Sequence, residues 1–127
     1  MNLQATPEGR GESRLAPVFA FNKAIRFVCI VDQEGNAIAS LGRPGLISLE
    51  PEERTADVFA RAAIAWGMSE GMNEYHGKVR TAIVIREKVT IVCFLGIGKM
   101  YLVFADPEFS ISETERLGRV LDRLSVG

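Results

Sequence analysis

The sequence predicts an α+β domain in which a five-stranded antiparallel sheet lies between one long helix and two terminal helices. Five short runs are rich in β-branched and aromatic residues, which favour strands. The last three runs are joined only by Arg86-Glu87-Lys88 and Gly96-Ile97-Gly98-Lys99, and connections this short require antiparallel neighbours. The central runs are apolar at both sets of alternate positions, so the sheet needs cover on both faces.

The first 13 of the 127 residues contain Gly, Pro and polar residues without apolar periodicity. Such a segment cannot offset its ordering entropy by burial, so we expect a flexible tail over 1–13 and a single domain over 14–127. Apolar residues around Pro17 predict a short helix over 15–24, because proline is tolerated in a first helical turn.

A β-hairpin is predicted next. The run from Ile25 to Val31 is almost wholly apolar and leads into the turn cluster Asp32-Gln33-Glu34-Gly35-Asn36. A second strand then runs from Ala37 to Leu41.

A long helix is predicted over about 55–75. The acidic stretch Glu50-Pro51-Glu52-Glu53 suits a helix N-terminus, and few β-branched residues follow it. Gly77 stands where a left-handed C-terminal cap is common, and His76 beside it favours the last carbonyl groups.

Three strands and a terminal helix complete the predicted order αββαβββα. The strands are expected over 79–85, 89–95 and 100–105. Ser112-Glu113-Thr114-Glu115 has the pattern of a capping box, with Ser112 as the cap. Apolar residues at helical spacing follow it: Leu117, Val120, Leu121 and Leu124.

The predicted long helix is hydrophobic nearly all round. One face would cover the sheet, and a surface helix would carry charges on the other. Here the other face is apolar or small, so we expect a second copy of the chain to cover it. The alternative is that Gly67 and Gly71 mark a bend or an early helix end. This predicted dimer face comprises Ala60, Ala63, Ile64, Gly67, Met68, Gly71 and Tyr75.

Composition excludes several classes of function. The formal charge is −1, so we expect no nucleic-acid partner, which would require a basic surface. No apolar run approaches the roughly 18 to 20 residues that span a bilayer, so membrane insertion is not expected. The N-terminus lacks the apolar core of a signal peptide and the chain has two cysteines, which favours a cytoplasmic location.

Candidate catalytic groups are sparse, so we expect no enzyme and no metal or cofactor. One histidine cannot supply a two-histidine metal site. Cys29 and Cys93 lie in apolar runs without Cys-x-x-Cys spacing, which is typical of buried small hydrophobic residues. The segment 96–99 lacks the spacing of a phosphate-binding loop and joins two strands.

A family resemblance is carried by two segments and by the helix that follows each. The segments are IRFVCIVDQEGNAIAS and VRTAIVIREKVTIVCFLGIGKMYLVFADPEFS. Over about residues 15–124 the chain resembles the roadblock/dynein light-chain family, which is related to the longin and profilin-like folds, and it is most similar to small archaeal members. The strand ending in Asp32, the turn with Gly35 and the following Ile38-Ala39 fit the hallmark of this family.

The resemblance implies a homodimer or heterodimer built from antiparallel long helices and from edge pairing of the next strand. In this sequence that strand contributes Thr81 and Ile83 to the expected interface. The resemblance also implies a non-enzymatic scaffold or adaptor, with a Ras-like small GTPase as a possible partner.

Two further alternatives stay open. The cations Lys78, Arg80, Arg86 and Lys88 lie along or beside one strand. They can deter unwanted edge pairing or attract an acidic partner. The alternative function is a profilin-like small-molecule sensor, with a cavity expected near Phe27, Trp66 and Phe94.

Overall fold

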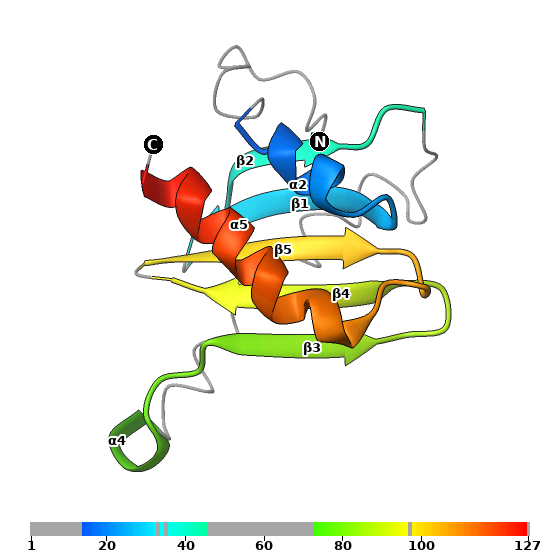
Figure 1. Cartoon of the computed structure of the whole chain (residues 1–127). Coiled ribbons are helices and arrows are strands. Elements are labelled where there is room, and N and C mark those ends of the chain that lie inside the picture. The colour runs from blue at the N-terminus through cyan, green and yellow to red at the C-terminus, as the bar shows by residue number, and fades with distance from the viewer. Residues whose placement is uncertain (1–13, 33, 35, 46–72, 97, 127) are drawn as a thin grey trace.

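One antiparallel sheet organises the chain in the computed structural model, which describes residues 14–32, 34, 36–45, 73–96 and 98–126. Its strand order is β2-β1-β5-β4-β3, so β2 and β3 are the edges and β5 is central (Figure 1). The strands are β1 (Ile25–Asp32), β2 (Ala37–Gly42), β3 (Thr81–Ile85), β4 (Thr90–Leu95) and β5 (Lys99–Ala105). All five predicted strands are confirmed, with ends that differ by one or two residues.

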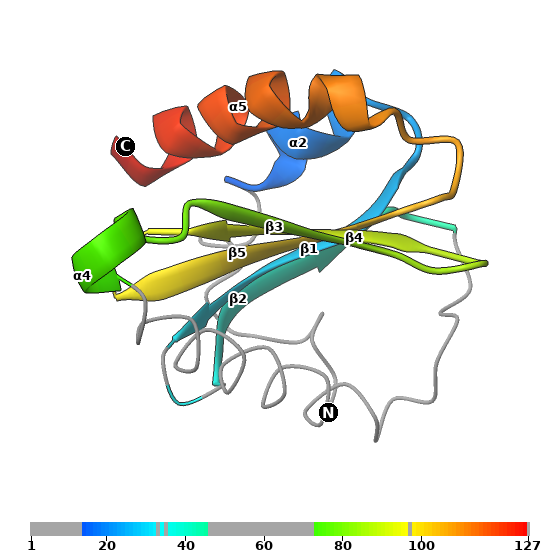
Figure 2. The same ribbon diagram turned by 90° about the horizontal axis from the view of Figure 1, so that it is seen from below.

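Two helices cover the same face of this sheet (Figure 2). They are α2 (Ala16–Phe21) and α5 (Thr114–Val126), and the 3-10 helix η3 (Ile111–Glu113) leads into α5. The predicted α+β class, and the placing of both terminal helices on one face, are therefore confirmed. The predicted long helix lies outside the described residues up to position 72.

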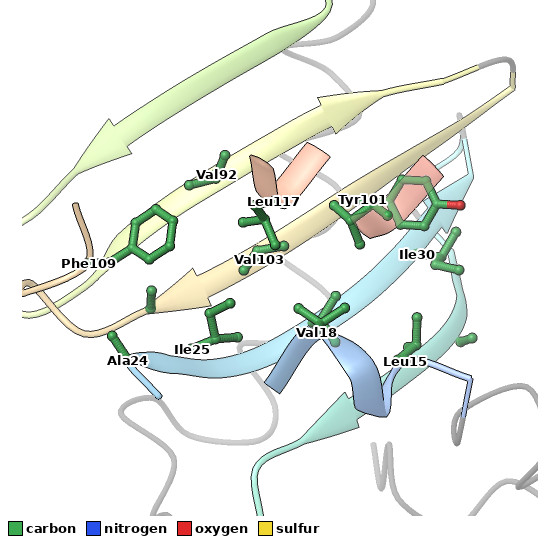
Figure 3. Close-up of a cluster of buried hydrophobic side chains, with 14 residues drawn as sticks. Leu15, Val18, Ala24, Ile25, Ile30, Val92, Tyr101, Val103, Phe109 and Leu117 are labelled. Carbon is green, nitrogen blue, oxygen red and sulfur yellow. The ribbon is translucent and has the colours of Figure 1, made fainter. Parts of the chain in front are cut away.

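The main hydrophobic core lies between these two helices and the sheet (Figure 3). Val18 of α2 and Leu117 of α5 are buried there against strand residues such as Val103. These contacts hold α2 and α5 against the central strand β5. The other members of the core are Leu15, Ala24, Ile25, Val28, Ile30, Ala39, Val92, Tyr101, Ala105, Phe109 and Leu121.

The opposite face of the sheet carries a second cluster of buried residues. Cys29, Val31 and Leu102 belong to it. The rings of Phe27 and Phe104 also meet there edge to face, with centroids 5.7 Å apart. The prediction that the central strands are apolar on both faces is confirmed.

Helix α2 is shorter than the 15–24 expected. The backbone turns extended at Asn22, and the side-chain oxygen of Asn22 accepts the N–H of Ala24 at 2.8 Å. An asparagine that bonds its neighbouring backbone in this way competes with the helix, so α2 ends at Phe21.

The start of the C-terminal helix also differs from the prediction. Ser110 is the cap, and its hydroxyl accepts the backbone N–H of Ser112. Glu115 pairs forward with Arg119 at 2.7 Å. The predicted capping box that begins at Ser112 was therefore wrong. The 3-10 helix η3 begins one residue earlier, at Ile111, and the hydroxyl of Ser110 already accepts the backbone N–H of Ser112.

The short helix α4 (Asn73–His76) carries the end of the predicted long helix. Gly77 follows with φ +80°, and its N–H donates to the carbonyl of Asn73 at 2.9 Å. The glycine cap and the position of His76 in the last turn are confirmed.

Candidate interaction surface at the β3 edge

Strand β3 forms an exposed and apolar edge of the sheet. All five of its residues are exposed, with exposed fractions of 37% for Ile83, 45% for Val84 and 64% for Ile85. The prediction that these residues would be covered on both faces was wrong for β3, because it lies at the sheet edge. Ile83 and Val84 are apolar, like the buried residues of β5, so composition alone could not identify this strand as the edge.

The hydrogen bonds to β4 determine which backbone groups of β3 face outward. The carbonyl of Arg80 accepts from the backbone N–H of Leu95, and the N–H of Arg86 donates to the carbonyl of Val89, both at 2.9 Å. In an antiparallel ladder the bonded residues alternate, so even-numbered residues of this segment bond β4. The N–H and C=O groups of Thr81, Ile83 and Ile85 therefore point toward the open edge.

The register with β4 assigns the side chains of β3 to the two faces. Ile83 lies opposite Val92, on the face that α5 covers. Val84 lies opposite Ile91, on the other face. Both faces of the edge thus present apolar side chains beside the open backbone groups.

Cations flank this apolar centre. Arg80 and Arg86 continue the ladder beyond the two ends of β3, and both are exposed. By alternation they project on the same face as Val84. Lys78 and Lys88 lie further out along the chain.

The predicted dimer residues fall into two groups. Tyr75 is 75% exposed on α4, which lies beyond the start of β3 (Figure 1), and Thr81 and Ile83 are exposed on β3 itself. The structure thus places these three on and near one edge. The remaining six, Ala60, Ala63, Ile64, Gly67, Met68 and Gly71, lie outside the described residues.

The two cysteines occupy one row of the sheet. Cys29 and Cys93 both lie opposite Leu102, on either side of β5. Neighbouring strands are about 4.8 Å apart, so the two residues are separated by about 10 Å, too far for a disulfide. Burial raises the pKa of Cys29 well above its ordinary value and that of Cys93 to about 11. The raised pKa values favour the neutral thiols, and Cys29 is buried and Cys93 half-buried in one cluster, in keeping with the prediction that they are small hydrophobic residues of the core.

Two further kinds of site, a metal site and a ligand cavity, bear on the function expected from the sequence. The described ranges contain no group of three or more His, Cys, Asp or Glu residues placed to hold a metal ion. Phe27 packs on one face of the sheet and Phe94 on the other, so these two rings do not line one cavity. Trp66 lies outside the described residues.

Sequence reasoning missed the role of Arg43. Its guanidinium donates to three backbone carbonyls, those of Ile25 at 2.7 Å and of Phe19 and Asn22 at 3.0 Å. It also lies over the ring of Phe19. Arg43 stands between Gly42 and Pro44, a pattern typical of a loop, and only the folded chain brings these carbonyls together.

Comparison with solved structures gives matches that span almost the whole chain. An MglB protein described with a tetrameric arrangement superposes with a TM-score of 0.78 at 13% identity, covering 96% of this chain and 90% of that one. The gliding protein MglB of Thermus thermophilus gives 0.74 at 12% identity, covering 96% and 93%. A roadblock/LC7 domain of Streptomyces avermitilis gives 0.68 at 14% identity, covering 89% of each chain.

The chain has a roadblock fold. The related profilin fold is also recovered, since a Schizosaccharomyces pombe profilin gives a TM-score of 0.61 at 14% identity, covering 91% of this chain and 98% of that one. No family model and no curated protein matches the sequence. None of the helices in the described ranges is long and apolar enough to span a bilayer.

Proposed function

We propose that this roadblock domain is a non-enzymatic scaffold that associates with itself and presents a surface to a Ras-like small GTPase. The observation that carries the proposal is the open β3 edge. Exposed Ile83 and Ile85 there lie beside backbone groups that lack a strand partner in the described part of the chain. Such an edge is a ready template for pairing with another chain.

The proposed self-association face joins two parts. Tyr75, Thr81 and Ile83 supply the described part. The predicted helix residues Ala60, Ala63, Ile64, Gly67, Met68 and Gly71 supply the other. The MglB structure with a tetrameric arrangement supports self-association for a chain of this fold. The GTPase partner and the cytoplasmic location rest on the resemblance to the roadblock family.

The first test is absolute solution mass by light scattering across a dilution series. We expect a species near twice 13.9 kDa. Ile83→Arg should shift the distribution toward monomer, because it places a charge at the centre of the proposed apolar contact. A native protein that stays monomeric at all concentrations would contradict the self-association.

A matched control is available on the same molecule. Ile111 in η3 is also an exposed isoleucine, at 51%, but it is not on β3. Ile111→Arg should therefore leave the mass unchanged. Gly67→Leu tests the predicted helix half of the interface separately, since it should favour monomer if another helix approaches closely there.

The GTPase partner is tested by affinity capture with the native chain as bait, in parallel with Ile83→Arg. We expect a nucleotide-bound Ras-like GTPase to be retained by the native protein. Capture of no GTPase under either GDP or GTP conditions would contradict this part of the proposal.

A further inference from the structure

We propose that the β3 edge is built to pair with a non-identical strand that carries acidic residues at both ends of an apolar centre, in preference to a second copy of β3. The inference rests on β3 being an association edge, as in the proposed function. It goes beyond that proposal, because a second copy of β3 can pair at this edge but a strand with acidic ends pairs there more tightly.

The outward backbone groups fix how two identical edges would meet. The backbone N–H and C=O groups of Thr81, Ile83 and Ile85 face outward, and Thr81 and Ile85 lie at equal distances along the strand on either side of Ile83. Two copies related by a twofold axis overlap over the whole of β3 when Ile83 lies opposite Ile83 of the partner subunit. Thr81 then bonds Ile85 of the partner subunit, and every outward N–H and C=O group of β3 is used.

This register opposes like charges at both ends. Arg80 lies directly opposite Arg86 of the partner subunit, and the twofold axis repeats the pair. Because the outward residues form the hydrogen-bonded pairs, the arginines fall at a non-hydrogen-bonded pair, where Cα atoms are only about 4.5 Å apart. Like charges placed directly opposite each other destabilise a strand pair.

Within residues 78–88, acidic groups do not offset this repulsion. Residues 78–88 contain four cations and a single acid, Glu87, which lies in the β3–β4 turn. Among ion pairs in the described ranges, Arg26 pairs with Asp106, Arg116 of α5 with Glu113 of η3, and Arg119 with Glu115; these pairs involve neither Arg80 nor Arg86.

A strand with acidic residues opposite Arg80 and Arg86 removes the conflict. It keeps the apolar contacts with Ile83 and Ile85 and the backbone hydrogen bonds, and it replaces two repulsive pairs by two attractive ones. The arginines that flank β3 thus favour a strand with acidic ends over a second copy of β3, because the mixed pair has the lower free energy.

The full-length charge-reversed variant Arg80→Glu with Arg86→Glu serves as the acidic partner. Mixed with the native chain in equal amounts, it should form mixed dimers in excess of the binomial distribution that random mixing gives. Native mass spectrometry measures the excess, which we expect to be about tenfold at low salt, from two charge pairs changed from repulsive to attractive. Raising salt from about 0.1 M to about 1 M shortens the Debye length from about 10 Å to about 3 Å and should restore random mixing.

The single variant Arg80→Glu gives an independent readout. When this variant pairs with itself, the introduced carboxylate at position 80 faces Arg86 of the partner subunit at both ends. Its homodimer should therefore dissociate about tenfold less readily than that of the native chain. Lys23→Glu changes the net charge equally at an exposed site outside β3, and should neither tighten the homodimer nor favour mixing.

The outcomes separate this inference from the proposed function. Random mixing, together with an unchanged dissociation constant for Arg80→Glu, overturns the inference and leaves the self-associating scaffold in place. Mixed dimers without native homodimers support the inference and overturn the self-association. Monomers alone in every mixture overturn both.

Discussion

Asp32 shows how one carboxylate determines a turn of this fold. Its side chain accepts the backbone N–H groups of Asn36 and Glu34, both at 2.9 Å, at the end of β1. The hydrogen bond from Asn36 is the main cause that lowers the pKa of Asp32 below its ordinary value. Asp32 therefore has a structural role in the β1–β2 hairpin.

The lowered pKa predicts a pH dependence of stability. A carboxylate with a lower pKa in the folded state stabilises the protein above its unfolded pKa, and this contribution is lost as pH falls through the folded value. Asp32→Asn keeps an acceptor oxygen and removes the titration. We expect the native protein to have the higher Tm at neutral pH, and the difference to shrink between about pH 5 and about pH 2. A difference independent of pH would contradict this role.

The thiols give a second prediction for single residues. Burial favours the neutral forms of Cys29 and Cys93, so little thiolate exists at neutral pH. We expect a thiol-reactive dye to label the native protein slowly and both cysteines rapidly in denaturant. Labelling of Cys93 should accelerate as pH rises toward its pKa of about 11. Rapid labelling of folded protein at neutral pH would count against this assignment.

Among the elements, α5 depends on one glycine to approach the sheet. A Cβ atom built on Gly118 would lie 3.1 Å from a ring carbon of Phe94. Leucine at this position has no room unless the helix or the ring moves, and overpacking of this kind typically costs about 1 to 3 kcal/mol. We therefore expect Gly118→Leu to lower the midpoint of urea unfolding.

Arg123→Leu is the matched control for this substitution. Arg123 is exposed on the same helix, so the change should alter the free energy of unfolding by no more than about 0.5 kcal/mol. Equal effects of the two substitutions would show that the helix does not pack closely at Gly118.

For the molecule as a whole, Arg43 links α2, β1 and the end of β2. Removing its guanidinium leaves three backbone carbonyls without this donor, and hydrogen bonds to a charged group contribute about 1.5 to 3 kcal/mol. We expect Arg43→Ala to lower the free energy of unfolding by about 2 kcal/mol or more in urea titrations.

Arg43→Lys distinguishes geometry from charge. Lysine keeps the charge but lacks the planar fork that reaches several carbonyls, so it should recover only part of the lost stability. Full recovery by lysine would show that charge alone is responsible.

Local sequence patterns determined the strands, the hairpin turns, the glycine cap at Gly77 and the fold class, because these follow from neighbouring residues and from periodicity. The predicted helix ends were less accurate at Phe21 and Ser110, where side-chain hydrogen bonds compete with the helix. Tertiary structure alone decided that β5 is central and β3 is an edge. Strand order depends on contacts between distant segments, which local patterns do not encode. The same contacts left Ile83 and Ile85 exposed between two arginines, and they brought three carbonyls to Arg43.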